Sequence, residues 1–100
     1  MIKIDTKTPV SDERIDVFSI DDETYSMPKE INGQFAMQVL DQIRAEGSEA
    51  TTAFILKECI GSKGYRALMD CQTLTTGDLK AVIKIVSDHV LGAVEDVAGK

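Results

Sequence analysis

The chain has 100 residues, of which 43% are hydrophobic and 28% charged, and its formal net charge is −6. This length suffices for one small domain with a modest core, and the composition is ordinary for a globular protein. The acidic balance makes nucleic acid and anionic membranes poor partners, because phosphate groups are neutralised by clustered lysine and arginine. No apolar run reaches the roughly 20 residues that a membrane-spanning helix needs, so we expect no membrane partner.

Residues 1–14 are expected to form an extended arm ahead of a single domain that covers residues 15–100. Ile2 and Ile4 alternate with polar residues, which suits a short strand. Pro9 and the Ser-Asp-Glu sequence that follows interrupt this pattern.

Residues 15–27 alternate between apolar and polar side chains and predict a β-hairpin with an acidic tip. A two-residue turn at Asp22-Glu23 predicts two cross-strand pairs on one apolar face: Ile20 with Tyr25, and Phe18 with Met27. A longer loop is the alternative, because the turn lacks the Asn-Gly or Asp-Gly pair that tight hairpins prefer. Since an isolated hairpin is only marginally stable, we expect it to lie against helices.

The remaining pattern, over residues 29–98, predicts a compact bundle of about four helices. The fold class is therefore mainly α with a small N-terminal β-hairpin. Asn32 caps a first predicted helix over 33–46, which Gly47 ends. Ser48 caps a second over 49–60, and a turn at Gly61 separates it from a short third helix over 62–70 that directs Tyr65, Leu68 and Met69 inward.

Residues 75–97 carry the longest periodic pattern in the chain and predict the last helix. Thr75 or Thr76 caps its start, and Gly99 ends it. Its apolar residues form one stripe about 120° wide, which the rest of the chain must cover. The stripe consists of Leu79, Val82, Ile83, Val86, Val90, Ala93, Val94 and Val97.

The residue types that carry chemistry do not form a catalytic or ligand-binding pattern. Cys59 and Cys71 form no CxxC motif, and with no export signal expected they are best explained as two small buried thiols rather than a disulfide. His89 is the only histidine and lies at the edge of the last helix's stripe, which predicts a half-buried structural residue. The acidic turn lacks EF-hand ligands, the glycines form no phosphate-binding loop, and no serine precedes a leucine as in carrier proteins. We therefore expect no enzyme, no cofactor and no metal.

Binding of an apolar partner is the remaining class of function. Met37 lies outside the apolar stripe of the helix predicted over 33–46, and Ile85 and Leu91 lie outside that of the last helix. These three are the candidate partner-binding residues, with methionine supplying adaptable contacts. The alternative is a core that covers a second side of these helices. We favour it for Met37 and weigh the two interpretations equally for Ile85.

Three segments carry a likeness to a known family. They are FSIDDETYSMP at 18–28, FILKECIGSKGYRALMD at 54–70 and LTTGDLKAVIKIVSDHVLGAVED at 74–96. In this order, and across about residues 17–97, they resemble the tail assembly chaperones of long-tailed (siphovirus) bacteriophages, in particular those that infect actinobacteria. This family is held together by such patterns and has no invariant catalytic residues.

The resemblance implies a non-enzymatic late protein in the cytoplasm of the infected bacterium, absent from the mature virion. Such a protein binds the phage tape measure protein, keeps it soluble and assists assembly of the tail tube. The family usually makes a longer form by ribosomal frameshifting, and this form and the tail tube protein are then expected in the assembly complex. Gly99-Lys100 would suit the end of the shorter form.

The main alternative is an acidic phage-encoded inhibitor that mimics nucleic acid and occupies a host protein. Residues 1–30 hold eight acidic and four basic residues, a net charge of −4, whereas the other seventy contribute −2. No predicted helix carries acids at phosphate-like spacing, which counts against the inhibitor. A bacterial adaptor or antitoxin-like module also remains compatible with the composition.

Overall fold

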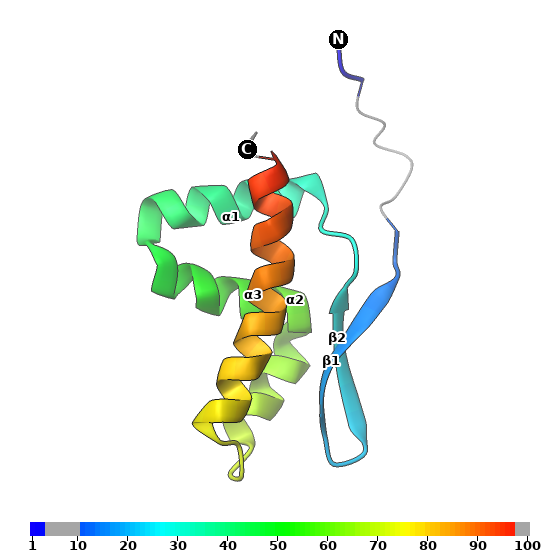
Figure 1. The fold of residues 1–100 in the computed structure, drawn as a ribbon, viewed down its shortest axis with the longest axis vertical. Coiled ribbons are helices and arrows are strands. Elements are labelled where there is room, and N and C mark those ends of the chain that lie inside the picture. The colour runs from blue at the N-terminus through cyan, green and yellow to red at the C-terminus, as the bar shows by residue number, and fades with distance from the viewer. Residues whose placement is uncertain (4–10, 98–100) are drawn as a thin grey trace.

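The computed structural model of the protein describes residues 1–3 and 11–97. The elements, in chain order, are β1 (Arg14–Ile20), β2 (Glu23–Pro28), α1 (Gly33–Glu46), α2 (Ser48–Asp70) and α3 (Thr76–Val97). In Figure 1, α1 and the first part of α2 run antiparallel to each other, α3 runs along the long axis of the molecule, and the hairpin lies along one side. The predicted mainly α class with an N-terminal hairpin is therefore confirmed. Of the arm predicted over 1–14, residues 4–10 lie outside the described residues.

The helix count differs from the prediction, because the described residues contain three helices and not four. The helices predicted over 49–60 and 62–70 are the two arms of a single bent α2, with Gly61 between them. Gly61 adopts φ 91° and ψ 165°, so the chain turns there and resumes the helix at once. Gly47, between α1 and α2, has almost the same backbone, with φ 87° and ψ −178°. This region of backbone space is open essentially to glycine alone.

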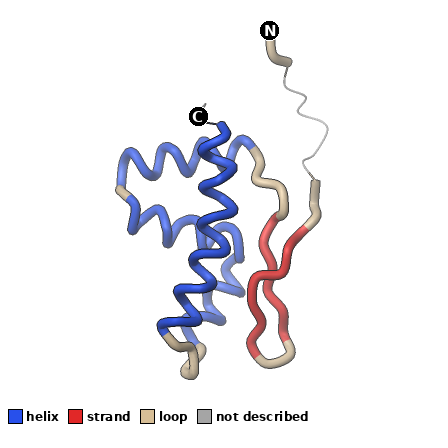
Figure 2. Tube along the Cα trace, viewed as in Figure 1, coloured by secondary structure: helices blue, strands red, loops and turns tan. Residues whose placement is uncertain are grey.

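The hairpin forms as predicted (Figure 2). Its register, however, differs from the prediction. The two-residue turn lies at Asp21-Asp22, one residue earlier than predicted, and Asp21 takes the left-handed φ of 54° that aspartate tolerates. A bulge leaves Val17 without a partner. The predicted pairs of Ile20 with Tyr25 and Phe18 with Met27 are therefore wrong. The observed apolar pairs are Phe18 with Tyr25 and Ile15 with Met27.

The bulge has a simple cause in the sequence of β1. The apolar residues fall at positions 15 and 17 and then at 18 and 20. In a regular strand, residues 15 and 17 would lie on one face of the hairpin and residues 18 and 20 on the opposite face. An extra residue in one strand shifts the alternation by one position. All four side chains are consequently partly buried.

The ends of the helices confirm two of the predicted caps. The Asn32 Oδ1 atom accepts a hydrogen bond from the Phe35 N–H at 2.8 Å, and the Thr75 Oγ1 atom accepts one from the Asp78 N–H at 3.0 Å. The predicted cap by Ser48 is wrong, since Ser48 already lies in the helix and Gly47 occupies the cap position with no side chain to offer. The Thr51 hydroxyl donates to the Gly47 carbonyl instead, at 2.6 Å. The predicted stop at Gly99 lies outside the described residues.

The core lies where the three helices and the hairpin meet. The centre of the α3 stripe is fully covered, as the prediction requires, because α1, α2 and β1 all pack against this helix. The buried hydrophobic residues are Met27, Ala36, Val39, Ile55, Leu56, Cys59, Ile60, Leu68, Val82, Val86, Val90 and Val94. Met27 from β2 has no exposed surface, so the hairpin is a part of the core and not an appendage.

Polar contacts fix the hairpin to the bent helix. The Arg14 guanidinium donates to the Ser26 hydroxyl at 2.8 Å and to the Cys59 carbonyl at 3.4 Å, just before the bend in α2. The Lys63 ammonium pairs with the Glu23 carboxylate, which lowers the pKa of Glu23 and raises the pKa of Lys63. Arg14 thus holds α2 just before the bend at Gly61, and Glu23 holds it just after the bend.

The link between β2 and α1 is tied to α3 by the single histidine. The Nε2 atom of His89 lies 2.6 Å from the Lys29 carbonyl oxygen, to which it donates a hydrogen bond. His89 is half-buried, which confirms the structural position predicted for it.

The two cysteines are free, in agreement with the prediction, but only Cys59 is fully buried. Burial, reinforced by the nearby Glu58 carboxylate and partly opposed by Arg14, raises the pKa of the Cys59 thiol to about 11. Cys71, which follows α2, is half-buried.

We predict that Gly61→Ala lowers the free energy of unfolding by about 1–3 kcal/mol, because alanine cannot adopt this backbone without strain. An added Cβ atom would meet nothing within 4 Å, so the loss of stability would come from the backbone conformation and not from a steric clash. Urea unfolding followed by circular dichroism measures it. Gly92→Ala is the control, because Gly92 lies inside α3 and has equally open surroundings. This substitution should raise the free energy of unfolding by up to about 1 kcal/mol, since alanine is the better helix former. Equal stability of Gly61→Ala and the wild type would show that the bend needs no glycine.

We also predict that the two thiols differ in reactivity. At pH 8 an aromatic disulfide reagent should modify Cys71 rapidly and Cys59 only when the protein unfolds, because the reaction needs an accessible thiolate. Cys71→Ser isolates the slow thiol, and Cys59→Ser isolates the fast one. Equal rates in the two variants would contradict the buried position of Cys59.

Candidate functional site

An apolar groove between α2 and α3 is the candidate functional site. Its volume is about 310 Å3, and Glu49 is the one charged residue in its lining. A neighbouring hollow shares Leu79 and Ile83 with it and continues it along α3 past Lys80. The name groove refers to the first hollow alone, and the second is its extension. The groove is lined by Glu49, Thr52, Ala53, Leu56, Tyr65, Leu68, Met69, Leu74, Leu79 and Ile83.

The bend at Gly61 creates this groove. Ala53 and Leu56 come from the first arm of α2, and Tyr65 and Met69 come from the second, so the lining spans the bend. A straight α2 would carry the second arm away from the first and leave no concave surface between them. The groove therefore depends on the glycine backbone described above.

Helix α3 forms the third wall of the groove, beside the two arms of α2. This wall exists because the apolar stripe of α3 is wider than the surface that the neighbouring elements cover. Val82 and Val86 are buried, whereas Leu79 and Ile83, which lie further around the helix, are only half-buried. These two side chains line the groove, and Ile83 also packs against the edge of the core. Residues predicted as one buried stripe thus divide into a buried row and a row that lines the groove.

Met69 is the exposed lip of the groove. It was predicted to point inward with Tyr65 and Leu68, and that prediction is wrong, since 71% of Met69 is exposed. Leu68 is buried and Tyr65 half-buried, as predicted. The apolar face of the second arm is wider than its contacts with the hairpin and α3, which leaves Met69 uncovered.

The three residues predicted to bind a partner lie in different places. Met37, on α1, is 62% exposed and does not line the groove. Ile85 is 44% exposed and lines a separate hollow of about 440 Å3 between β1 and α3, together with Val17 and Phe18. Leu91 is half-buried and packs against the core. The structure thus does not bring them together, and none of them lines the groove.

Another hollow, larger than the groove, has a more polar lining. Its volume is about 620 Å3, and its lining includes Asp12, Glu13, Glu30 and Glu58 together with Arg14. Two of these acids already have partners within the chain. The Glu13 carboxylate lies 3.9 Å from the Lys29 ammonium, and the Glu30 carboxylate accepts a hydrogen bond from the Ser11 N–H at 3.2 Å. This hollow therefore offers a weaker candidate than the groove.

The residues that the structure describes show neither a metal site nor a membrane-spanning helix. Within residues 1–3 and 11–97, no three or more His, Cys, Asp and Glu side chains gather as a metal site would require. In those residues, no helix combines the length and the apolar character needed to cross a bilayer.

We predict that Met69→Asp changes the free energy of unfolding by less than about 0.5 kcal/mol, because the side chain is largely in solvent. Leu68→Ala, one position earlier, should cost about 2–5 kcal/mol, because it empties a buried position. Urea unfolding distinguishes the two variants. A large loss of stability in Met69→Asp would show that Met69 belongs to the core and not to the lip of the groove.

Comparison of the chain with protein-family models, with curated proteins and with solved structures found no match.

Proposed function

We propose that this protein is a tail assembly chaperone of a long-tailed bacteriophage, which binds the tape measure protein in the groove between α2 and α3. It acts by binding and not as an enzyme. The observation that carries the proposal is the groove itself, an open concave surface that ten residues line with a single charge among them. A surface of this kind suits the apolar face of a helix.

The chemistry of the partner matches such a groove. A tape measure protein is a long, largely helical chain, and before the tail tube surrounds it the apolar stripes of its helices are open to aggregation. A small domain that covers one short stretch of stripe binds weakly, so many copies along one chain protect it and remain displaceable by tube subunits. The net charge of −6 on each copy keeps the coated chain soluble through mutual repulsion.

The remaining parts of the proposal come from the resemblance of the sequence to the tail assembly chaperones. The chaperone acts in the cytoplasm of the infected cell, together with a longer frameshifted form of itself and the tail tube protein, and leaves before the virion is complete. The coding DNA tests this part directly. A slippery heptamer near the last codons, with an overlapping −1 reading frame, is the expected finding.

We predict that co-expression of this chain raises the soluble fraction of the tape measure protein, the longest product encoded nearby, and that the two proteins co-purify. Met69→Asp should weaken the interaction about tenfold or more, because binding would bury an unpaired carboxylate. Met37→Asp is the matched control, since it places the same charge at another exposed methionine, outside the groove. Ile85→Asp tests the hollow beside the hairpin in the same way.

Different failures have different meanings in this experiment. Loss of binding in Met37→Asp or Ile85→Asp, with Met69→Asp unaffected, would place the interface away from the groove. If neither this chain nor its longer frameshifted form keeps the tape measure protein soluble, the chaperone function is refuted. The acidic inhibitor would then be the function to test.

A further inference from the structure

The cations of the domain divide into two groups according to their contacts. Residues 11–97 contain eight lysine and arginine side chains, and five of them have partners within the chain. Arg14 donates hydrogen bonds to Ser26 and Cys59, and the other four form ion pairs. These ion pairs are Lys29 with Glu13, Arg44 with Asp41, Lys63 with Glu23 and Lys84 with Asp88. The cations without an ion pair or side-chain hydrogen bond in this part of the chain are Lys57, Arg66 and Lys80.

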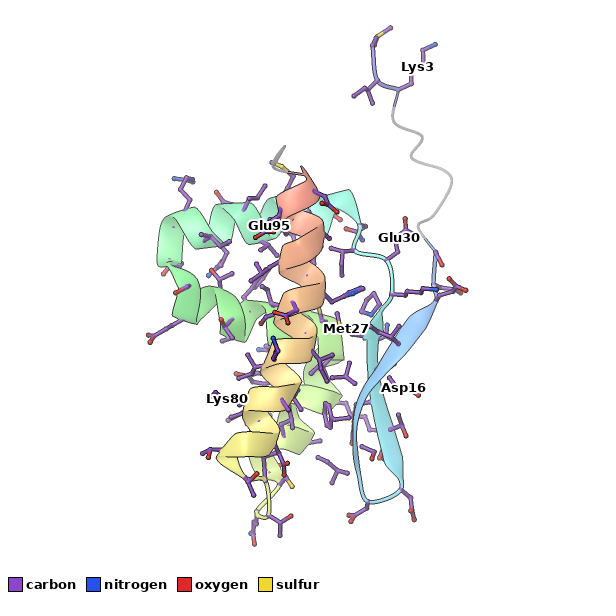
Figure 3. The ribbon with its side chains drawn as sticks, in the orientation of Figure 1. Lys3, Asp16, Met27, Glu30, Lys80 and Glu95 are labelled. Atoms are coloured by element: carbon purple, nitrogen blue, oxygen red, sulfur yellow. The ribbon has the colours of Figure 1, made fainter. Side chains whose placement is uncertain are left out.

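All three unpaired cations lie beside the groove, one on each wall. Lys80, labelled in Figure 3, lines the extension of the groove along α3 and lies on the side of this helix away from the hairpin. Lys57 follows Ala53 by four residues on the first arm of α2. Arg66 precedes Met69 by three residues on the second arm. Side chains three or four apart are neighbours on a helix surface, so each of these two cations adjoins a residue that lines the groove.

The acids near the groove do not cancel this charge. Glu49 is the one acid in the lining. Asp70 lies four residues after Arg66, in a position where an ion pair would be expected, but forms none with it. The edge of the groove therefore carries more positive than negative charge, in a chain whose net charge is −6.

We propose that the groove selects amphipathic helices whose apolar stripe is flanked by acidic residues. This inference assumes the helix-binding groove of the proposed function and adds the charge of its ligand. Lys57, Arg66 and Lys80 are exposed, so their partners in a complex would be carboxylates at the margin of the helix and not buried groups. Such contacts contribute little affinity each, but they discriminate between ligands of opposite charge. They also offset the general repulsion between an acidic chaperone and an acidic ligand.

The test uses two synthetic helical peptides with the same apolar stripe, one flanked by glutamate and the other by lysine. Fluorescence anisotropy measures their binding to the full chain at about 20 mM and about 300 mM NaCl, where the Debye length falls from roughly 20 Å to below 8 Å. We expect the glutamate peptide to bind about tenfold more tightly at low salt, and the difference to shrink at high salt. The lysine peptide also controls for the net charge of the chain, which by itself favours the opposite preference.

The triple variant Lys57→Glu, Arg66→Glu and Lys80→Glu should reverse the preference between the peptides. The matched control is Lys3→Glu, Lys29→Glu and Arg44→Glu, which changes the net charge equally at exposed positions outside the groove and should keep the preference for glutamate. Circular dichroism confirms that both variants are folded.

Three results would overturn the inference: equal binding of the two peptides, tighter binding of the lysine peptide, or binding of neither. Equal binding would remove the charge selection and leave the apolar groove as a binding site. A failure of the proposed function appears elsewhere, as an insoluble tape measure protein in the co-expression experiment. The two conclusions can therefore fail separately.

Discussion

The bend of α2 at Gly61 is the constraint on which the rest of this structure depends, because it turns one long helix into two walls of a groove. Its φ of 91° and ψ of 165° lie in a region that side chains with a Cβ atom avoid. The hairpin holds the bend from both sides, through Arg14 on the Cys59 carbonyl and Glu23 on Lys63. Gly64 adds to this, since a Cβ atom there would collide with Ile60 and lie 3.2 Å from the ring of Tyr25. Two glycines and a small sheet thus position an apolar surface.

The groove combines two kinds of side chain with separate roles in the proposed function. In that function its apolar lining would give affinity for almost any amphipathic helix, which suits a chaperone that must cover successive segments of one long partner. The exposed cations around it would then determine which helices are preferred, because exposed charges discriminate more than they bind. Acids elsewhere on the chain would keep the proposed complex soluble. Weak affinity and selectivity would be compatible in this arrangement, since they would come from different residues.

Much of the fold could be predicted from local patterns. The bounds of α1, the caps by Asn32 and Thr75, and the buried centre of α3 follow from short-range chemistry. The two helices predicted on either side of Gly61 match the two arms of α2, and only their union in one bent helix was not predicted. A glycine turn that interrupts a helix has the same local signature as one that separates two helices. The predicted hairpin register is wrong because it assumes a regular alternation. The change from apolar residues 15 and 17 to apolar residues 18 and 20 instead requires a bulge.

The sequence by itself determined which residues are apolar and how often they recur, and therefore the elements and most of the core. Only the tertiary structure decided which edge of each apolar stripe is covered. Leu79 and Val82 belong to one predicted stripe, yet one lines the groove and the other is buried, because α1, α2 and β1 together cover only part of the surface of α3. Met69 and Leu68 differ for the same reason. Periodicity reports the face of a helix, whereas exposure depends on the neighbours that the whole fold supplies.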